Sequence, residues 1–255
     1  MTSPFDLGGK IAIVTGGNGG IGLGMARGLA GAGATIVIAA RNGEKSRAAV
    51  TELTNAGGRA IAVSTDVTDD KALVALADAT LKQFGRIDIL VANAGTTVRK
   101  PPQTISVSEW HKVIDTNLTS TLVASQSVYP AMKAAGGGKI ITIGSMMSLF
   151  GASYSPAYAA SKGGVVQLTR SLACAWAADN IQANCVLPGW IDTEMTQGAR
   201  QQVDGLHERV LNRTPANRWG HTRDFAGIAV FLASSASDFV TGAAIPVDGG
   251  YSVMA

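Results

Sequence analysis

Apolar runs rich in Val, Ile and Ala alternate with segments of helical period along almost the whole of this chain. We expect strands at 10–15, 35–40, 60–64, 87–92, 139–144, 182–187 and 244–247, and helices at 20–31, 44–56, 69–84, 108–135, 157–179 and 222–234. Several of the strands are apolar throughout, which suits a parallel sheet covered on both faces. The alternation therefore predicts an α/β fold, a doubly wound parallel seven-stranded sheet flanked by helices on both faces.

Neither an internal repeat nor a Pro/Ser-rich linker divides the sequence, so residues 1–255 are expected to form a single domain. Right-handed crossovers place the carboxyl ends of the strands, and the loops after them, along one edge of the sheet. The least regular stretch, 189–217, is too long for an ordinary loop. We interpret it as a substrate lid with short helices.

Charge and cysteine content argue against several classes of protein. The net charge is +3 with no basic run of the kind that binds nucleic acid. Cys174 and Cys185 are not in a CxxC pair, and His111, His207 and His221 lack ligand-like spacing, so no metal is predicted. No apolar run approaches the ~20 residues of a membrane helix, and no signal peptide is visible. We therefore expect a cytoplasmic protein with free thiols and no membrane partner.

A glycine-rich loop, Thr15-Gly-Gly-Asn-Gly-Gly-Ile-Gly22, joins the first expected strand to the first helix. Glycine permits a tight turn with positive φ and lets phosphate oxygens approach the backbone. The helix that follows presents unpaired N–H groups and the positive end of its dipole to that phosphate. The string matches G-x-G-x-x-G through Gly17, Gly19 and Gly22, at the place where a Rossmann-type fold binds a dinucleotide.

The end of the second strand indicates which dinucleotide is bound. No carboxylate follows that strand to accept hydrogen bonds from a free ribose 2′-hydroxyl; the sequence there is Ala40-Arg41-Asn42. Arg41 offers a fork of donors to a 2′-phosphate, so NADP(H) is the preferred cofactor, with NAD(H) possible. Asp66, after the third strand, either accepts a hydrogen bond from the adenine amino group or caps the segment that follows it.

A candidate catalytic group follows the fifth strand. Ser145 stands at the end of that strand, and Tyr158 and Lys162 are spaced i, i+4, which places them on one face of a helix. A tyrosine holds its proton to a pKa of about 10, and a nearby ammonium favours the phenolate. Tyr158 is therefore the candidate proton-transfer residue, and Ser145 is placed to donate to the same substrate oxygen.

With these pieces in place, residues 7–251 resemble the short-chain dehydrogenase/reductase family. The resemblance rests on the glycine loop, Asn93-Ala94-Gly95, Asn117, Ser145, Tyr158-x-x-x-Lys162, Pro188-Gly189 with Thr193, and Val247-Asp248-Gly249-Gly250. The family assigns the loop glycines as Gly16, Gly20 and Gly22, and we adopt that assignment over the literal motif. The resemblance also implies a homotetramer.

Roles for the individual residues are implied by the same resemblance. Tyr158 donates a proton in reduction or accepts one in oxidation, Lys162 lowers its pKa and hydrogen-bonds the nicotinamide ribose, and Ser145 polarises the carbonyl. Asn117 positions a water that relays protons through Lys162. The candidate cofactor-binding set is Gly16, Asn18, Gly20, Ile21, Gly22, Arg41, Asn42, Asp66, Val67, Asn93, Ala94, Gly95, Tyr158, Lys162, Pro188, Gly189, Ile191 and Thr193.

For the substrate, the sequence is most similar to the branch of gluconate 5-dehydrogenase, 2-deoxygluconate 3-dehydrogenase and 3-oxoacyl reductase-like enzymes, through 99–101, 144–146 and 213–220. Arg99 or Lys100 could pair with a sugar-acid carboxylate. However, Tyr154 occupies a place where that branch often has a basic residue, and Met147 and Trp190 give the expected pocket an apolar character. Arg99, Met147, Tyr154 and Trp190 are the candidate substrate-binding residues.

We therefore expect an NADP(H)-dependent oxidoreductase that interconverts a ketone and a secondary alcohol, on a sugar acid or a small ketone. A 3-oxoacyl-thioester reductase is the alternative enzyme. A dinucleotide-binding regulator without catalytic activity is the alternative of another class, but such a protein has no need of Ser145, Tyr158, Lys162 and Asn117 together.

Overall fold

The computed structural model describes residues 3–254 and contains a seven-stranded parallel sheet in the order β3-β2-β1-β4-β5-β6-β7. The strands are β1 (Ile11–Thr15), β2 (Thr35–Ala40), β3 (Arg59–Ser64), β4 (Ile89–Ala92), β5 (Gly138–Ile143), β6 (Ile181–Pro188) and β7 (Ala244–Val247). The strand order reverses beside β1, where β2 and β4 are its two neighbours. The fold predicted from the sequence is confirmed.

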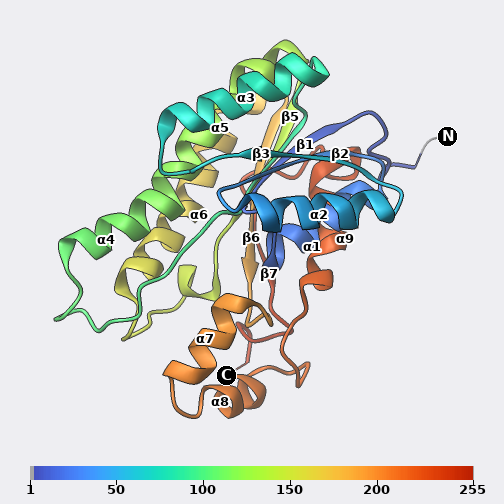
Figure 1. Cartoon of the computed structure of the whole chain (residues 1–255). Helices are drawn as coiled ribbons and strands as arrows, with labels where there is room; N and C mark the ends of the chain where they lie inside the picture. Colours follow the sequence, from blue (N-terminus) through green and yellow to red (C-terminus); the bar gives the residue numbers. More distant parts are fainter. Residues whose placement is uncertain (1–2, 255) are drawn as a thin grey trace.

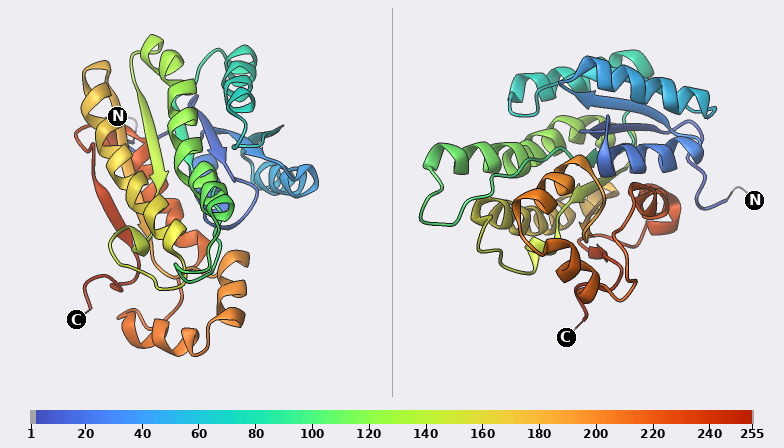
Figure 2. Two further views of the ribbon diagram at one scale, coloured as in Figure 1. Left: turned by 90° about the vertical axis from the view of Figure 1, so that its left-hand side faces the viewer. Right: turned by 60° about the horizontal axis from the view of Figure 1, so that its bottom comes forward.

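Helices cover both faces of the sheet (Figures 1 and 2). One face carries α1 (Gly20–Gly31), α2 (Gly43–Asn55) and α9 (Ala226–Ala233), and the other carries α3 (Asp70–Phe84), α5 (Ser120–Ala134) and α6 (Pro156–Trp176). Within β1, Ala12 and Val14 join the first core cluster, whereas Ile11 and Ile13 join the second. Alternate side chains point to opposite faces, so a strand buried on both must be apolar throughout.

The expected long helix at 108–135 is interrupted. α4 (Val107–Ile114) runs into a π-helical turn, Asp115–Thr119, before α5 begins. Asn117, inside this turn, accepts a hydrogen bond from the Thr96 N–H and donates to the Thr96 carbonyl, at 2.8 and 3.0 Å. π-turns inside α-helices often mark functional sites, and this one turns Asn117 toward the loop after β4. The prediction of one regular helix was wrong at this point.

Two other expected helices end or begin with a tighter turn. α6 stops at Trp176 and continues as a 3-10 turn, Ala177–Asp179, which closes at Asn180 in the left-handed conformation. The 222–225 stretch is likewise a 3-10 turn that leads into α9. Helix ends commonly tighten in this way, so the expected ranges are correct in place but too long as α-helix.

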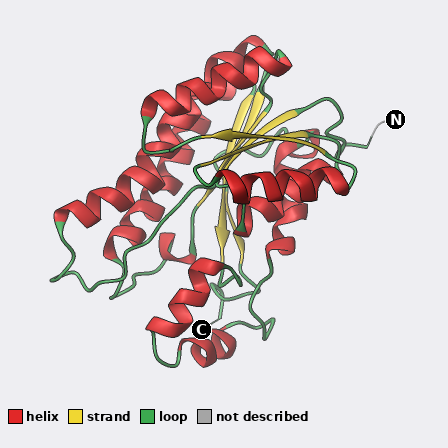
Figure 3. Ribbon diagram, viewed as in Figure 1, coloured by secondary structure: helices red, strands yellow, loops and turns green. Residues whose placement is uncertain are grey.

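The 189–217 stretch contains two short helices, α7 (Glu194–Gln202) and α8 (Leu206–Arg213), as its length and irregularity predicted. They lie beyond the carboxyl ends of the strands, at the bottom of Figures 1 and 3. Their apolar residues pack around Trp219 in a cluster separate from the main core. The guanidinium of Arg200 stacks 3.7 Å from the Trp219 ring centroid, and the indole N–H donates to His207.

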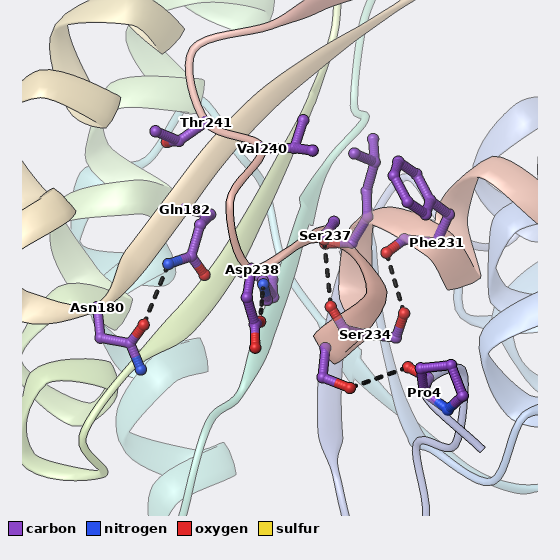
Figure 4. A network of polar contacts seen from close by, with 12 residues as sticks. Pro4, Asn180, Gln182, Phe231, Ser234, Ser237, Asp238, Val240 and Thr241 are labelled. Carbon is purple, nitrogen blue, oxygen red and sulfur yellow. Dashed lines mark hydrogen bonds and ion pairs between the residues drawn. The ribbon is translucent and has the colours of Figure 1, made fainter.

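The opposite edge of the sheet, at the amino ends of the strands, carries a network of polar contacts (Figure 4). Gln182 donates to Asn180, and the Ser235 hydroxyl donates to the carbonyl of Pro4. In the part of the chain that the structure describes, no helix is long and apolar enough to cross a membrane. Over the same residues, no three His, Cys, Asp or Glu side chains gather in a way that could hold a metal ion.

Candidate active site

Two cavities meet at the carboxyl edge of the sheet. The first, of about 440 Å³, follows the glycine loop and the ends of β4, β5 and β6. The second, of about 280 Å³, lies between the segment after β5 and the start of α7. Ser145, Tyr158, Pro188, Gly189, Met195 and Thr196 line both. A molecule in the first cavity therefore meets a molecule in the second beside Ser145 and Tyr158.

The glycine loop has the backbone that the family assignment requires. Gly16 and Gly20 have φ values of +63° and +54°, in the left-handed region that favours glycine. At Gly22, a side chain would collide with the Asn93 amide and the Gly16 carbonyl. Asn93 donates to the carbonyls of Thr15 and Gly16 at 3.0 and 3.2 Å, so it holds the loop against β4. The loop and the start of α1 fit a dinucleotide pyrophosphate.

The ends of β2 and β3 form the outer part of this groove. Arg41 is largely exposed, and its guanidinium lies 3.6 Å from a carboxylate oxygen of Asp66. Asp66 accepts hydrogen bonds from the Thr68 N–H and hydroxyl, and these bonds lower the pKa of its carboxyl. Asn42 caps α2, and its carbonyl accepts from Ser46. Asp66 therefore caps its own turn, which is one of the two predicted roles. The other role, accepting a hydrogen bond from the adenine amino group, stays a prediction.

Most of the candidate cofactor residues lie together. Those lining the first cavity are Gly16, Asn18, Gly20, Ile21, Asn93, Ala94, Gly95, Tyr158, Lys162, Pro188, Gly189, Ile191 and Thr193. Gly22 is packed behind the loop, and Val67 packs against the second core cluster. Arg41, Asn42 and Asp66 lie at the outer end of the groove rather than in its lining.

Tyr158 and Lys162 come from the same face of α6, but Lys162 does not lower the tyrosine pKa here. Its ammonium donates to the Ile143 carbonyl at 2.7 Å and lies 5.7 Å from the Tyr158 ring centroid. Burial raises the pKa of Tyr158, against smaller lowering effects of a hydrogen bond to Ser145 and the charge of Arg99. Burial also lowers the pKa of Lys162 to about 8. In this arrangement Tyr158 is a phenol that holds its proton at neutral pH.

The hydroxyl of Ser145 is oriented by its own turn. Its oxygen accepts from the Met147 N–H at 3.1 Å, which leaves the hydroxyl proton free to donate. Ser148 then joins this turn to α6, because its hydroxyl accepts from the Ser145 N–H and donates to the Lys162 carbonyl. Asn117 reaches α6 as well, through a 2.9 Å bond to Ser161. The four candidate catalytic residues are therefore connected through β5, α6 and the π-turn.

All four candidate substrate-binding residues line the second cavity: Arg99, Met147, Tyr154 and Trp190. Arg99 donates to the Met195 carbonyl at 3.0 Å and to Gln202 at 3.3 Å, so it contacts α7. Lys100 instead pairs with Glu109 at 2.6 Å and does not line the cavity. Of the two cations after the Asn-Ala-Gly motif, Arg99 alone lies at the site.

Sequence reasoning did not find Lys45, Glu194 or Ser46. Lys45, in the first turn of α2, bonds Glu194 of α7 at 2.7 Å, and both line the first cavity. Ser46 accepts a hydrogen bond from Asn18 of the glycine loop. Lys45 and Ser46 could have been predicted as site residues from their position, because they lie in the first turn of the helix that follows the second strand. Glu194 had none, because its contact joins residues far apart in the sequence.

Comparison with known proteins agrees with this geometry. A family model described as enoyl-(acyl carrier protein) reductase matches residues 16–252, nearly the whole chain. The chain belongs to the short-chain dehydrogenase/reductase family. It is therefore an oxidoreductase, as the joint presence of glycine loop and Tyr-Lys pair predicted, and the regulator alternative is not supported.

Several relatives match over almost their whole length. 2-Dehydro-3-deoxy-D-gluconate 5-dehydrogenase of Dickeya dadantii is 42% identical, with 98% of both chains covered. Cis-4-hydroxycyclohexanecarboxylate dehydrogenase of Sinomonas cyclohexanicum is 39% identical, covering 96% of this chain and 97% of that protein. A solved structure of gluconate 5-dehydrogenase from Burkholderia cenocepacia, in complex with NADP and tartrate, is 40% identical. It covers 99% of this chain and 98% of its own, with a TM-score of 0.94.

Proposed function

We propose that this enzyme interconverts a ketone and a secondary alcohol with NADP(H). The observation that carries the proposal is the place of Ser145 and Tyr158, which line both the groove that fits a dinucleotide and the adjoining cavity. Two hydroxyl groups at that junction suit a substrate oxygen next to a nicotinamide. NADP in the related gluconate 5-dehydrogenase structure supports the choice of cofactor.

The protein's own residues supply the proton chemistry. NADPH, when bound, supplies the hydride. Tyr158 holds its proton at neutral pH, since burial raises its pKa, and it is placed to donate that proton to the substrate oxygen during reduction. Ser145 donates a hydrogen bond to the same oxygen. We assign Lys162 and Asn117 to the return of a proton to the phenol, since the Lys162 ammonium lies 5.7 Å from the Tyr158 ring centroid and Asn117 bonds Ser161 on the same helix.

The residues that would hold NADP(H) are the glycine loop, Asn93 to Gly95, and Pro188 to Thr193, with Arg41 at the 2′-phosphate. Asn18 and Asn42 support that end, because Asn18 bonds both the Asn42 carbonyl and Ser46. Arg41 pairs only loosely with Asp66, so most of its donors face solvent. A 2′-phosphate at this position gains charge-assisted hydrogen bonds that a free hydroxyl does not.

Replacing Arg41 with Ala is expected to raise the KM for NADPH about tenfold and to leave the KM for NADH within twofold. The gain from an exposed arginine is modest because solvent screens it. Steady-state kinetics with both cofactors measures the ratio. Arg59→Ala is the matched control, since Arg59 is an exposed arginine at the amino end of β3, whereas Arg41 follows the carboxyl end of β2. An equal rise for both cofactors would contradict the assignment of Arg41.

A carboxylate on the substrate is supported by two observations. The relatives named above act on 2-dehydro-3-deoxy-D-gluconate and cis-4-hydroxycyclohexanecarboxylate, both of which are acids. Arg99 lies in the wall of the cavity that would receive the substrate. A 3-oxoacyl thioester gains less support, because it carries no carboxylate at the thioester end for Arg99 to pair with and the relatives named above act on free acids.

The assembly and the lid belong to the same proposal. We take residues 1–255 as a single catalytic domain in which 189–217 closes over substrate, supported by the contact of α7 with Arg99. Homotetramers are the family expectation, and light scattering on the purified enzyme tests it. Two free cysteines, one of them exposed, support a cytoplasmic location.

The direct test is NADPH oxidation at 340 nm with a panel of ketones and keto acids. Turnover of at least one ketone, with formation of the secondary alcohol, is the expected result. Absence of turnover across the panel, in enzyme shown to bind NADPH, contradicts the proposed reaction.

A further inference from the structure

The lining of the second cavity has an unusual balance of charge. Among the described residues that line it, Arg99 is the one charged side chain, and none is Asp or Glu. Large apolar and aromatic side chains make up much of the remainder: Met146, Met147, Phe150, Trp190, Met195 and Tyr251. A cavity with one cation and no anion favours an anionic ligand, and its walls favour a ligand with an apolar body.

Eight side chains of the lining carry a hydroxyl group, and three of them, Thr97, Ser155 and Thr196, bond other protein groups. Thr97 and Ser155 bond each other at 3.0 Å, and Ser155 also reaches the Val98 carbonyl. The Thr196 hydroxyl donates to the Ile191 carbonyl. Ser145 and Tyr158 are required by the reacting oxygen. The hydroxyls of Ser153, Tyr154 and Tyr251 are left for the rest of a ligand. They are fewer than the four free hydroxyls of 5-keto-D-gluconate, and a buried hydroxyl without a partner is costly.

The apolar wall is held in place rather than adaptable. The guanidinium of Arg213, at the end of α8, stacks 4.8 Å from the Phe150 ring centroid and 4.6 Å from that of Tyr251. The two rings meet edge to face at 6.5 Å. Stacking of this kind fixes both rings, so the cavity keeps its apolar surface on this side.

Arg99 keeps donors for a ligand. An arginine has five N–H donors, and the two bonds to Met195 and Gln202 use only two of them. Its charge reaches Tyr154 and Tyr158, because it lowers the pKa of both phenols against the larger effect of burial. Arg99 and Tyr158 also line the same cavity of about 280 Å³, so one small molecule can contact both.

We propose that the substrate is a carboxylate with an apolar, ring-sized body, held through its carboxylate by Arg99, with its ketone at Tyr158. The inference rests on the proposed reaction and narrows it, since it excludes polyhydroxylated sugar acids as the preferred class. The cavity of about 280 Å³ has room for such a molecule, since a cavity of about 150 Å³ accepts benzene.

Three ketones separate the features of the proposal. 4-Oxocyclohexanecarboxylate has the ring and the acid, 4-methylcyclohexanone has the ring alone, and 5-keto-D-gluconate has the acid on a polyhydroxylated chain. With NADPH, the first is expected to have a kcat/KM about 30-fold above each of the other two. In Arg99→Met, the advantage of the ring acid over the neutral ring ketone is expected to fall to about one. Arg99→Lys keeps the positive charge but loses the two parallel donors of the guanidinium, and it is expected to retain part of the advantage of the ring acid.

Lys100→Met is the matched control, because it removes the neighbouring cation, which pairs with Glu109 outside the cavity, and it is expected to keep the 30-fold ratio. Calorimetry gives a second readout without turnover. Cyclohexanecarboxylate is expected to bind the enzyme–NADP⁺ complex at least tenfold more tightly than D-gluconate does, and to lose that affinity in Arg99→Met.

Equal kcat/KM values of the wild type for 4-oxocyclohexanecarboxylate and 4-methylcyclohexanone would overturn the role of the carboxylate. A higher kcat/KM for 5-keto-D-gluconate than for 4-oxocyclohexanecarboxylate would overturn the preference for an apolar body. Turnover of 4-methylcyclohexanone in either case shows that the proposed reaction still stands. If no ketone is reduced, the proposed reaction fails, and the calorimetric comparison still decides the ligand class.

Discussion

Replacing Tyr158 with Phe is expected to lower kcat for ketone reduction about 1,000-fold. The phenol lies at the junction of the two cavities and holds its proton at neutral pH, and a positioned proton donor contributes about 10²- to 10⁴-fold to such a step. Phenylalanine fills the same buried space without the hydroxyl, so NADPH binding is expected to stay within a few-fold of wild type. Single-turnover kinetics and a fluorescence titration with NADPH measure the two quantities separately.

Tyr129→Phe is the control for loss of a tyrosine hydroxyl. Tyr129 lies on α5, and its hydroxyl donates to Asp179 on the surface at 2.7 Å, away from both cavities. Its replacement is expected to leave kcat within twofold. If Tyr158→Phe reduces ketones at the wild-type rate, the proton must come from another group, and the assignment of Tyr158 is wrong.

Features of the site that depend on local pattern could be predicted from the sequence. The apolar strands, the glycine loop and the i, i+4 pair of Tyr158 and Lys162 each follow from a period or a short motif. Because parallel strands end at one edge, the same patterns also brought Asn93, Ser145 and Pro188 together. The structure places these residues around one groove.

Features that depend on contacts between distant segments could not be predicted. The π-turn at Asn117 forms because its amide bonds the backbone of Thr96, and helical period in the sequence carries no trace of that contact. The Lys45–Glu194 pair likewise joins α2 to α7, whose position is set by packing around Trp219. The direction of the pKa shift of Tyr158 depends on burial, which outweighs the charges nearby.

Replacing Lys162 with Met is expected to lower kcat/KM about 100-fold and to stabilise the fold. Lys162 is 4% exposed, and burial lowers its pKa from 10.5 to about 8. A shift of that size corresponds to roughly 3 kcal/mol against folding with the charge in place. Methionine removes that cost but leaves the Ile143 carbonyl without its donor, a loss of about 1 kcal/mol. The free energy of unfolding at pH 7 is therefore expected to rise by about 1–2 kcal/mol.

The pH dependence separates this cause from a change in packing. Because the folded-state pKa of Lys162 is the lower one, the folded wild type releases this proton near pH 8, while the unfolded chain keeps it to about 10.5. Wild-type stability should thus rise relative to Lys162→Met between these two pH values, and the difference between the two proteins should shrink. Urea unfolding at pH 7, 8, 9 and 10 measures it, with Lys71→Met as the exposed-lysine control. A variant that is less stable than wild type at pH 7 would show that the ammonium stabilises the fold, and that Lys162 is not held there at a cost for catalysis.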